Sequence, residues 1–576
     1  MIPKASQALL GLAAVAIAFA AADTYVVVLA LPDMMSTVGL DVDEIQRAAP
    51  IVSGFLLGYV GVLPLIGRIS DLRGRVPVLL GCLVVFAIGS VVTAAAYDLP
   101  TIVTGRLVQG IGGGGLIPPT LALVADLWPP PKRGFPLGVV GAVQELGSVL
   151  GPLYGAVVLS FGSWRDIFWL NCAVGLVLAA AMVRLREEAP ATPARPGRFD
   201  VLGAVLGVLT LTGLTLVMLE PQRLVEGVTS GLAFLPVTGD SRWLTPVALT
   251  TYGLLVLFLA RLATARRPLV DWRGWSSVPA QTDVGGALLL AVGLGAVIVT
   301  FASAEPESAA VSPKAAFLLP LAVVTFAGFW WRQRTAPNPL VPRGALGSRP
   351  AWGALVVSFF VGSALIAALV DIPFFARLTV YRDSQLDAAL VLLRFLIALP
   401  VGAVLGGWLL RRVPAHVLTA VAMLLSASAF AHMATWDAES LKHGSETISL
   451  VVAGLGFGLA IAPVNAVLLE HTTDAVHGVA SALLIVARMI GMLLGVSALT
   501  TIGLRAFYDA SADIPPAEQL CGSASLCDAY KDAVRDAGIT QLHAVFVGAA
   551  VCAVVAAVLA AWLLRGTRAA SLTAER

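Results

Sequence analysis

Charged residues are scarce in this chain. Only 12% of its 576 residues are Asp, Glu, Lys or Arg, and 58% are hydrophobic, whereas soluble proteins carry about 25% charged residues. Apolar runs long enough to cross about 30 Å of hydrocarbon recur along the whole chain and leave no room for a sizeable soluble domain. The composition therefore predicts an integral membrane protein. The net charge of +2 gives no sign of nucleic-acid binding.

Motifs for nucleotide, metal or catalytic chemistry are also missing. No lysine follows a glycine, so the chain lacks the Gly-Lys phosphate loop of nucleotide-driven pumps. His471, Asp474 and His477 lie in a short turn without thiolates or a matching distant pair, which indicates a solvated turn rather than a metal site. No cluster of histidines and acids suits a membrane acyltransferase that would use His471 or Asp371. We expect no metal, no organic cofactor and no enzymatic activity.

Cysteines are few, and only Cys521 and Cys527 lie together in a polar loop. A disulfide between them is expected if this loop is extracytoplasmic, and two free thiols are the alternative. The amino terminus has a lysine before an apolar run, like a signal peptide. That run continues through Asp23 to Pro32, however, and is long enough to span. We interpret it as the first membrane helix.

The apolar runs fall into two blocks of six helices, which predicts a pseudo-symmetric transporter. In the first block the expected spans are 8–32, 48–66, 76–96, 99–127, 134–159 and 166–184. In the second they are 350–376, 384–410, 415–435, 448–469, 475–506 and 540–564.

Four further runs lie between the blocks, near 201–219, 245–262, 284–303 and 315–331. They look like a duplicated hairpin, because the sequence from Asp200 to Ala204 recurs from Asp283 to Ala287, and Pro268-Leu-Val recurs as Pro339-Leu-Val. The prediction is an all-α protein with about sixteen spans, or fourteen as the alternative. Its parts are an N-terminal bundle at 1–190, a linker at 191–348, a C-terminal bundle at 349–567, an extracytoplasmic loop at 507–539 and a tail at 568–576.

Lysine and arginine are more frequent on the side of the membrane that would hold the amino terminus. By the positive-inside rule, both termini are expected in the cytoplasm. We expect a monomer that crosses the cytoplasmic membrane many times.

The loop after the second span carries a glycine, an acid and basic residues at regular spacing: Gly67, Asp71, Arg73, Gly74 and Arg75. Glycines permit a tight turn, and the charged residues can form ion pairs that close this side. A plain positive-inside loop is the alternative. The pattern Gly-x-x-x-Asp-x-x-Gly-Arg resembles the cytoplasmic signature of the major facilitator superfamily, which implies a transporter of two rocking halves.

The fifth span carries five small or bending residues around one acid, Glu145: Gly138, Gly147, Gly151, Pro152 and Gly155. This resembles the motif of the antiporter branches of that superfamily. On a helical wheel, Gly138, Gly141, Glu145, Ser148, Pro152 and Gly155 share one stripe, with Gly147 and Gly151 nearly opposite. The helix is therefore expected to have two close-packing faces.

Further segments narrow the resemblance. Residues 23–32, the sequence from Arg106 to Gly115 and residues 164–171 resemble signatures of the drug:proton antiporter branch with fourteen spans. Residues 144–155, 396–408 and 487–495 are similar to mycobacterial triacylglyceride exporters that work with a lipoprotein partner. The resemblance implies a lipophilic cargo, such as a lipid, and an extracytoplasmic lipoprotein. The duplicated hairpin in the linker is where the chain departs from the branch with fourteen spans.

Six charged side chains are expected within spans, where ionisable groups usually mark a pathway or relay: Asp23, Glu145, Asp371, Arg106, Arg394 and Arg488. An acid that pairs with an arginine in only one conformation couples proton uptake to movement, and a permanent ion pair that fixes helix register is the alternative. Arg488 is the expected partner of Asp23 or Glu145. Arg106 either tunes a carboxylate or extends toward the interface.

These observations predict a proton-coupled exporter of lipophilic compounds. A broad multidrug antiporter is the alternative within transport, and a membrane enzyme or a non-transporting sensor lies outside it.

Overall fold

The protein consists of helices, as expected for a chain in lipid, where each backbone N–H and C=O needs a partner within its own segment. Within the residues that it describes, the computed structural model has sixteen helices long and apolar enough to span a membrane, which confirms the prediction of sixteen. It describes residues 4–40, 45–188, 200–265, 278–302, 314–382, 384–521 and 527–565. The expected tail at 568–576 and the first copy of the Pro-Leu-Val repeat at 268–270 lie outside these residues.

The N-terminal half forms six spans from eight helices. Two spans are each divided in the middle, because prolines at 64, 118 and 119 lack the N–H that would continue the helix. The helices are α1 (Lys4–Thr37), α2 (Ile45–Gly61), α3 (Leu63–Arg73), α4 (Arg75–Ala94), α5 (Leu99–Gly114), α6 (Ile117–Leu127), α7 (Gly134–Phe161) and α8 (Trp164–Glu188).

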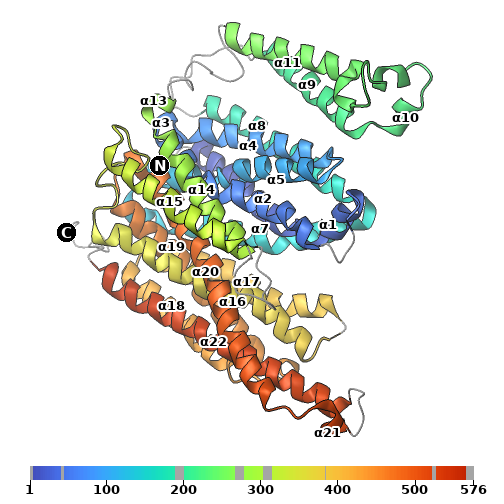
Figure 1. Cartoon of the computed structure of the whole chain (residues 1–576). Coiled ribbons are helices and arrows are strands. Elements are labelled where there is room, and N and C mark those ends of the chain that lie inside the picture. The colour runs from blue at the N-terminus through green and yellow to red at the C-terminus, as the bar shows by residue number, and fades with distance from the viewer. Residues whose placement is uncertain are drawn as a thin grey trace, which may run out of the picture.

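The C-terminal half forms six spans from one long helix each, α16 (Arg349–Leu378), α17 (Gln385–Leu409), α18 (Ala415–Met433), α19 (Glu446–Glu470), α20 (His477–Ala512) and α22 (Asp528–Leu563). One buried core lies within the C-terminal half, and a second, in the N-terminal half, also includes residues of α14 (Val284–Ala302), α19 and α20. Between the halves, α7 packs along α17, and α3 packs against the start of α20. Figure 1 shows the blue N-terminal half and the orange-red C-terminal half side by side.

The linker forms two helical hairpins with different surroundings. The second, α14 (Val284–Ala302) and α15 (Ala315–Thr335), packs on α2 and also touches α20, so it lies at the junction of the halves. The first, α9 (Val201–Leu219) and α11 (Pro246–Thr264), lies at the periphery (Figure 1) and touches the main bundle near α4. There, Trp243 Nε1 donates to Tyr97 Oη at 3.1 Å.

The two hairpins are closed by the same pair of residue types, which supports their origin as a repeat. Asp200 accepts from Gly203 N–H at 3.1 Å and pairs with Arg261 at 2.9 Å. Asp283 accepts from Gly286 N–H at 2.9 Å and pairs with Arg332 at 2.6 Å.

Both of these carboxylates lie just outside their spans. The hydrogen bond from Arg261 lowers the pKa of Asp200 below its usual value. Partial burial alone would raise the pKa of Asp283, but hydrogen bonds from Arg332 and from the backbone lower it overall. Both carboxylates therefore stay ionised at neutral pH, and both hairpins stay closed.

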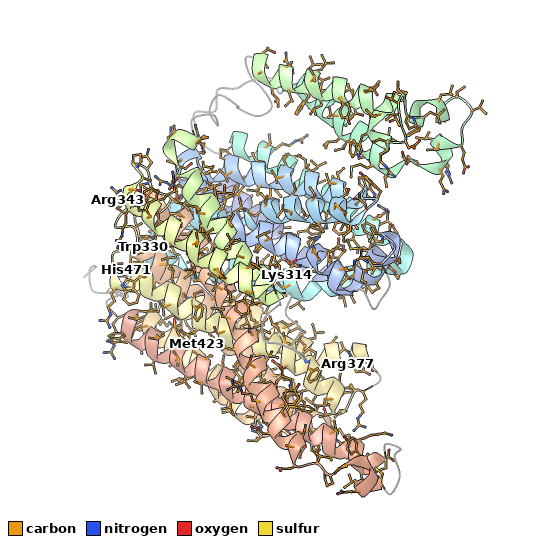
Figure 2. All side chains as sticks on the ribbon, viewed as in Figure 1. Lys314, Trp330, Arg343, Arg377, Met423 and His471 are labelled. Atoms are coloured by element: carbon orange, nitrogen blue, oxygen red, sulfur yellow. A yellow bond between two sulfur atoms is a disulfide. The ribbon has the colours of Figure 1, made fainter. Side chains whose placement is uncertain are left out.

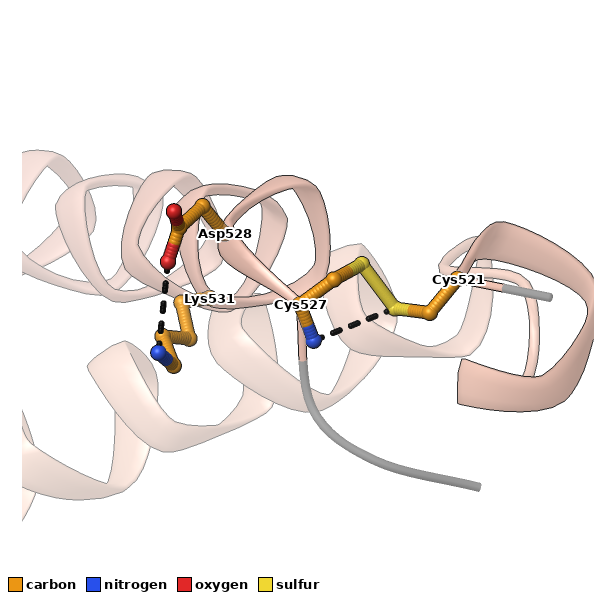
Figure 3. Close-up of a disulfide and its surroundings, with 4 residues drawn as sticks. All are labelled: Cys521, Cys527, Asp528 and Lys531. Atoms are coloured by element: carbon orange, nitrogen blue, oxygen red, sulfur yellow. Dashed lines mark hydrogen bonds and ion pairs between the residues drawn. A yellow bond between two sulfur atoms is a disulfide. The ribbon is translucent and has the colours of Figure 1, made fainter. Parts of the chain in front are cut away.

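The polar loop expected at 507–539 is largely helical, because α20 continues to Ala512 and α22 begins at Asp528. Each of these helices has 36 residues, and about 1.5 Å per residue gives about 54 Å, well beyond about 30 Å of hydrocarbon. The charged first turns of α22 occupy this extension. Cys521 and Cys527 are joined by a disulfide beside it (Figure 3). We call this end of the molecule the disulfide end.

Thiol counting tests this disulfide. Three of the five cysteines are free in the structure, Cys82, Cys172 and Cys552. Alkylation of the denatured, unreduced protein is expected to label three thiols, and labelling after reduction is expected to reach all five. Because the bond closes a short loop, its loss is expected to cost about 2 kcal/mol locally and to leave the spans folded. Five labelled thiols without reductant would contradict the pairing.

Candidate functional site

A carboxylate in the centre of the N-terminal half is held by donors from two other helices. Asp23 of α1 is fully buried. Arg106 Nη1, on α5, donates to its Oδ2 at 2.5 Å, and Gln109 Nε2 donates to its Oδ1 at 3.1 Å. Asn171 of α8 donates to the same oxygen, and Ser90 of α4 accepts from Gln109 at 3.0 Å. Both oxygens of the Asp23 carboxylate are therefore hydrogen-bonded.

Arg106 does not extend toward the membrane interface in this conformation. Its side chain is fully buried, and its guanidinium lies 4.3 Å from the centroid of the Phe55 ring. Nη1 also donates to Gln109 Oε1 at 2.8 Å, while Nη2 is buried without a hydrogen-bond partner among the described residues. A charge held this way depends on its carboxylate, because removing one member of a buried pair leaves the other uncompensated.

A second carboxylate lies where the two halves meet. Glu145 of α7 and Arg488 of α20 line one central cavity together with Gln144 and Asn465. The described residues include no direct ion pair between Glu145 and Arg488, although the arginine acts on the carboxyl electrostatically. An acid and a base therefore face the same space from opposite halves without being locked together.

Most of the other side chains around this cavity are apolar. In this conformation the space open to the centre of a water molecule is only about 30 Å³, which is room for a few waters at most. Any larger molecule would therefore require the halves to separate further. The remaining lining residues are Ile117, Leu121, Leu137, Val140, Gly141, Ser358, Val361, Ala460, Ile461, Val464, Leu484 and Ile485.

Helix α7 joins the two carboxylate sites. On one face, a Cβ atom at Gly147 would lie 2.1 Å from the carbonyl oxygen of Ala18, on the helix that carries Asp23. On the other, a Cβ atom at Gly138 would lie 2.4 Å from the carbonyl oxygen of Ala403, on α17 of the other half. The two close-packing faces expected from the helical wheel are thus present.

Two details refine this picture of α7. Gly151 and Gly155 both lie against α1, at Ala22 and Val26, so Gly155 belongs with Gly147 and Gly151 rather than with Gly138. The backbone of Pro152 is helical in α7, and its side chain lies outside the described set. Further along the helix, Tyr154 Oη donates to Asn171 Oδ1 at 2.9 Å. This bond links α7 to a ligand of Asp23.

The structure does not bring Asp371 or Arg394 to either carboxylate site. Arg394 Nη1 donates to Thr447 Oγ1 at 2.9 Å within the C-terminal half. Asp371 is half-buried in α16, and the described residues give it no hydrogen bond or ion pair. Neither lines the central cavity.

The junction of α3 and α4 joins the halves at one end, which we call the latch end. The loop expected here is reduced to Gly74, because α3 continues to Arg73 and α4 begins at the next residue after the glycine. Asp71 accepts from the N–H groups of Gly478 and Val479 at 2.8 and 3.0 Å, so its carboxylate caps the first turn of α20. An anion is favourable there because the N–H groups and the helix dipole both point at it. Arg75 also binds Asp71 and donates to Asp126 at 3.2 Å.

Other residues at the junction of α3 and α4 strengthen the contact between the halves. Arg75 Nη2 donates to the carbonyl of Asp474 at 3.1 Å, which is a further bond between the halves. At Gly67 a Cβ atom would lie 2.5 Å from the Gly478 carbonyl oxygen, so only glycine fits. Gly74 has a φ of 89°, which lets the chain turn directly into α4. Arg73 ends α3. The latch end is therefore closed in this structure.

The turn before α20 also lies at the latch end. Figure 2 shows His471 on the opposite side of the view from Arg377. His477 is buried, and its Nε2 lies 3.0 Å from the Leu469 carbonyl oxygen and 3.2 Å from that of Thr472. The described residues contain no group of three His, Cys, Asp or Glu that would hold a metal. His477 therefore holds the turn in place.

Asp71→Asn is expected to weaken the latch, because an amide offers one acceptor oxygen where the carboxylate offers two and it lacks the charge that binds Arg75. We expect about a tenfold loss of transport, equivalent to about 1.4 kcal/mol, and faster maleimide labelling of a cysteine placed at buried Ser481. Asp474→Asn is the matched control, because its side chain is 87% exposed and only its carbonyl binds Arg75. Equal labelling rates in both variants would contradict the latch.

Sequence reasoning singled out Asp23 and Arg106, and it included Gln109 and Asn171 only as parts of the segments that resemble the antiporter branch, without giving either residue a role. Gln109 lies three residues after Arg106 on the same helix face, and that spacing could have indicated it. Asn171 and Tyr154 carry no such local signal, because Asn171 lies 148 residues from Asp23. The Asp–Arg pairs that close the linker hairpins were also missed.

Two six-helix halves, a latch between them and charged residues at their junction define a secondary transporter. The chain belongs to the Major Facilitator Superfamily, whose sequence pattern matches residues 13–305 and 269–496 in two overlapping parts. The human organic anion transporter MFSD10 has a similar fold, with a TM-score of 0.53, 14% identity and coverage of 97% of this chain and 100% of that one.

Within the superfamily, the chain is similar to proteins named triacylglyceride transporters. It is 36% identical to that of Mycolicibacterium hassiacum over 517 residues, which cover 87% of this chain and 81% of the relative. It is 33% identical to that of Mycolicibacterium smegmatis, covering 94% and 85%. With that of Mycobacterium tuberculosis the identity is 35%, covering 87% and 84%. A transporter rather than an enzyme follows from these relationships.

Proposed function

We propose that this transporter exports lipids of the triacylglyceride class from the cytoplasmic membrane in exchange for protons. The observation that carries the proposal is the central cavity, where apolar side chains from both halves surround one acid, Glu145, and one base, Arg488. Apolar walls with a few polar groups suit a lipophilic cargo. The names of the relatives support the same cargo class.

Asp23 and Glu145 would carry the protons in this mechanism. Protonation of Asp23 removes the charge that Arg106 binds, and protonation of Glu145 removes its attraction to Arg488. Helix α7 touches the helix of Asp23 through Gly147 and the opposite half through Gly138. A movement at the Asp23 site would therefore be transmitted through α7 to the central cavity. The closed latch end is one state of the alternating-access cycle, and opening it would admit lipid from the cytoplasmic side or the inner leaflet.

Transport by purified protein in vesicles tests the proposal. A fluorescent triacylglyceride should leave the vesicles faster with an imposed pH gradient than without one, and a protonophore should remove the difference. Equal rates would refute proton coupling. If cationic dyes move and triacylglyceride neither moves nor competes with them, the protein is a multidrug antiporter instead.

The direction of transport and the lipoprotein partner are parts of the same proposal. Lysine and arginine are more frequent on the side of the latch end, which supports placing it in the cytoplasm. The lipid would then leave toward the disulfide end, where the resemblance implies a lipoprotein acceptor. Labelling an engineered cysteine near Cys527 with an impermeant reagent in intact cells tests this orientation, since no labelling would reverse it.

A further inference from the structure

A groove separate from the central cavity opens at the latch end, between the start of α1 and the start of α7. Its volume is about 690 Å³, within the range of small-molecule sites. Leu10 and Ala14 of α1 form one wall, and Phe135 and Val139 of α7 form the other. Trp128 also lines it. The walls are thus mainly apolar.

Two cationic side chains line this groove, and neither has an acidic partner among the described residues. Lys132 precedes α7 and Arg411 follows α17, and both side chains are exposed. The guanidinium of Arg411 lies 5.7 Å from the ring centroid of Phe135, which is 40% exposed. The neighbouring Arg133 differs, because it donates to the carbonyls of Trp128 and Ala125 at 2.9 and 2.8 Å and is buried. Among the described residues that line the groove, Lys132 and Arg411 are the cations available to an anion.

The two cations come from different halves of the transporter. Lys132 belongs to the N-terminal half and Arg411 to the C-terminal half, next to the point where a Cβ atom at Gly134 would lie 2.8 Å from the Gly407 carbonyl oxygen. A single anion bound by both side chains would therefore connect the halves. Val140 lines both the groove and the central cavity, so the groove lies one side chain away from the transport site.

The apolar walls and the two neighbouring cations at the membrane surface together indicate which class of ligand fits the groove. A soluble anion would not use the apolar walls, and a triacylglyceride has no charge for Lys132 or Arg411. An anionic phospholipid supplies both parts, with an acyl chain for the groove and a phosphate for the cations. We propose that this groove binds an anionic phospholipid of the surrounding leaflet, whose phosphate bridges Lys132 and Arg411.

Such a lipid stabilises the closed latch end. Lys132 and Arg411 face one groove only while the start of α7 and the end of α17 stay in contact, so the bridged phosphate binds this arrangement better than an open one. A ligand shifts a conformational equilibrium by its difference in affinity for the two states. The lipid is thus a regulator that is distinct from the cargo.

Native mass spectrometry of the purified full-length protein tests the binding. Phosphatidylglycerol and phosphatidylcholine with the same palmitoyl and oleoyl chains are titrated in parallel. The protein is expected to bind phosphatidylglycerol about thirtyfold more tightly, as two cations near an anionic headgroup predict. K132Q/R411Q should lose this preference, and each single variant should lose part of it. R412Q is the matched control, because Arg412 lies over Trp408 and outside the groove.

A labelling experiment tests the effect on conformation. In a background where Cys82, Cys172 and Cys552 are serine, phosphatidylglycerol should slow maleimide labelling of S481C, and K132Q should remove this effect. Equal affinity for the two lipids, or an unchanged preference in K132Q/R411Q, would overturn the site. A labelling rate that does not respond to phosphatidylglycerol would overturn the bridging of the halves. None of these measurements depends on the cargo. They therefore test the phospholipid site independently of the proposed lipid export.

Discussion

Asp23→Asn is expected to abolish proton-driven transport and to destabilise the N-terminal half. Asparagine keeps the size of the side chain but cannot take up a proton, and it leaves Arg106 as an uncompensated charge in a fully buried position. Breaking a buried pair in this way costs about 3–5 kcal/mol. Transport into or out of reconstituted vesicles should fall to the rate of vesicles without protein, and the thermal midpoint in detergent should fall as well.

A second variant separates the loss of the proton site from the loss of stability. Asp23→Asn/Arg106→Gln removes both charges, so it should recover stability while transport stays absent. Asp371→Asn is the matched comparison, because it removes another acid from a span without breaking any described hydrogen bond or ion pair. A transporter with Asp23→Asn that still responds to a pH gradient would show that Asp23 holds helices together and carries no proton.

Glu145→Gln is expected to remove the response to the pH gradient with little change in stability. Glu145 has no direct ion pair among the described residues, so the change breaks no bond, yet it removes the only acid on the cavity wall. Transport with a gradient should fall to the rate measured without one. The measurement is lipid movement from vesicles at several imposed gradients.

Coupling between Glu145 and Arg488 can be measured with a double-mutant cycle. If the two groups act together, Glu145→Gln and Arg488→Gln should have non-additive effects on the gradient response, as for residues that share one network. Arg394→Gln is the control, because this arginine also lies within a span but binds Thr447 away from the cavity. Additive effects would mean that Glu145 works without Arg488.

The features that the sequence predicted well are those that depend on local composition. Span lengths follow from apolar runs, and the two faces of α7 follow from helical periodicity, as Gly138 and Gly147 show. Asp71 was placed at the junction by its spacing from glycine and arginine, but its partners were not, because the N–H groups of Gly478 and Val479 lie more than 400 residues away.

The linker shows a different limit. Its two hairpins have similar sequences and the same Asp–Arg closure, at Asp200 and at Asp283, yet only α14–α15 packs at the junction of the halves. The apolar surface of a membrane helix can pack against a neighbouring helix or against acyl chains, because both are apolar. The sequence of a helix therefore does not show which of the two surrounds it. The position of Arg106 was open for the same reason, since both a carboxylate and the interface would accept its charge.

The length of α20 and α22 has a mechanical consequence. The two helices run together from the membrane to the tip closed by Cys521 and Cys527. If the C-terminal half turns about a point near the middle of the membrane, the tip sweeps a longer arc than the cavity wall does, in proportion to its distance from that point. Distances measured from spectroscopic labels on the tip would therefore change detectably for a rotation that is too small to resolve with a label near Glu145. The extension is thus a suitable place for labels that follow the transport cycle.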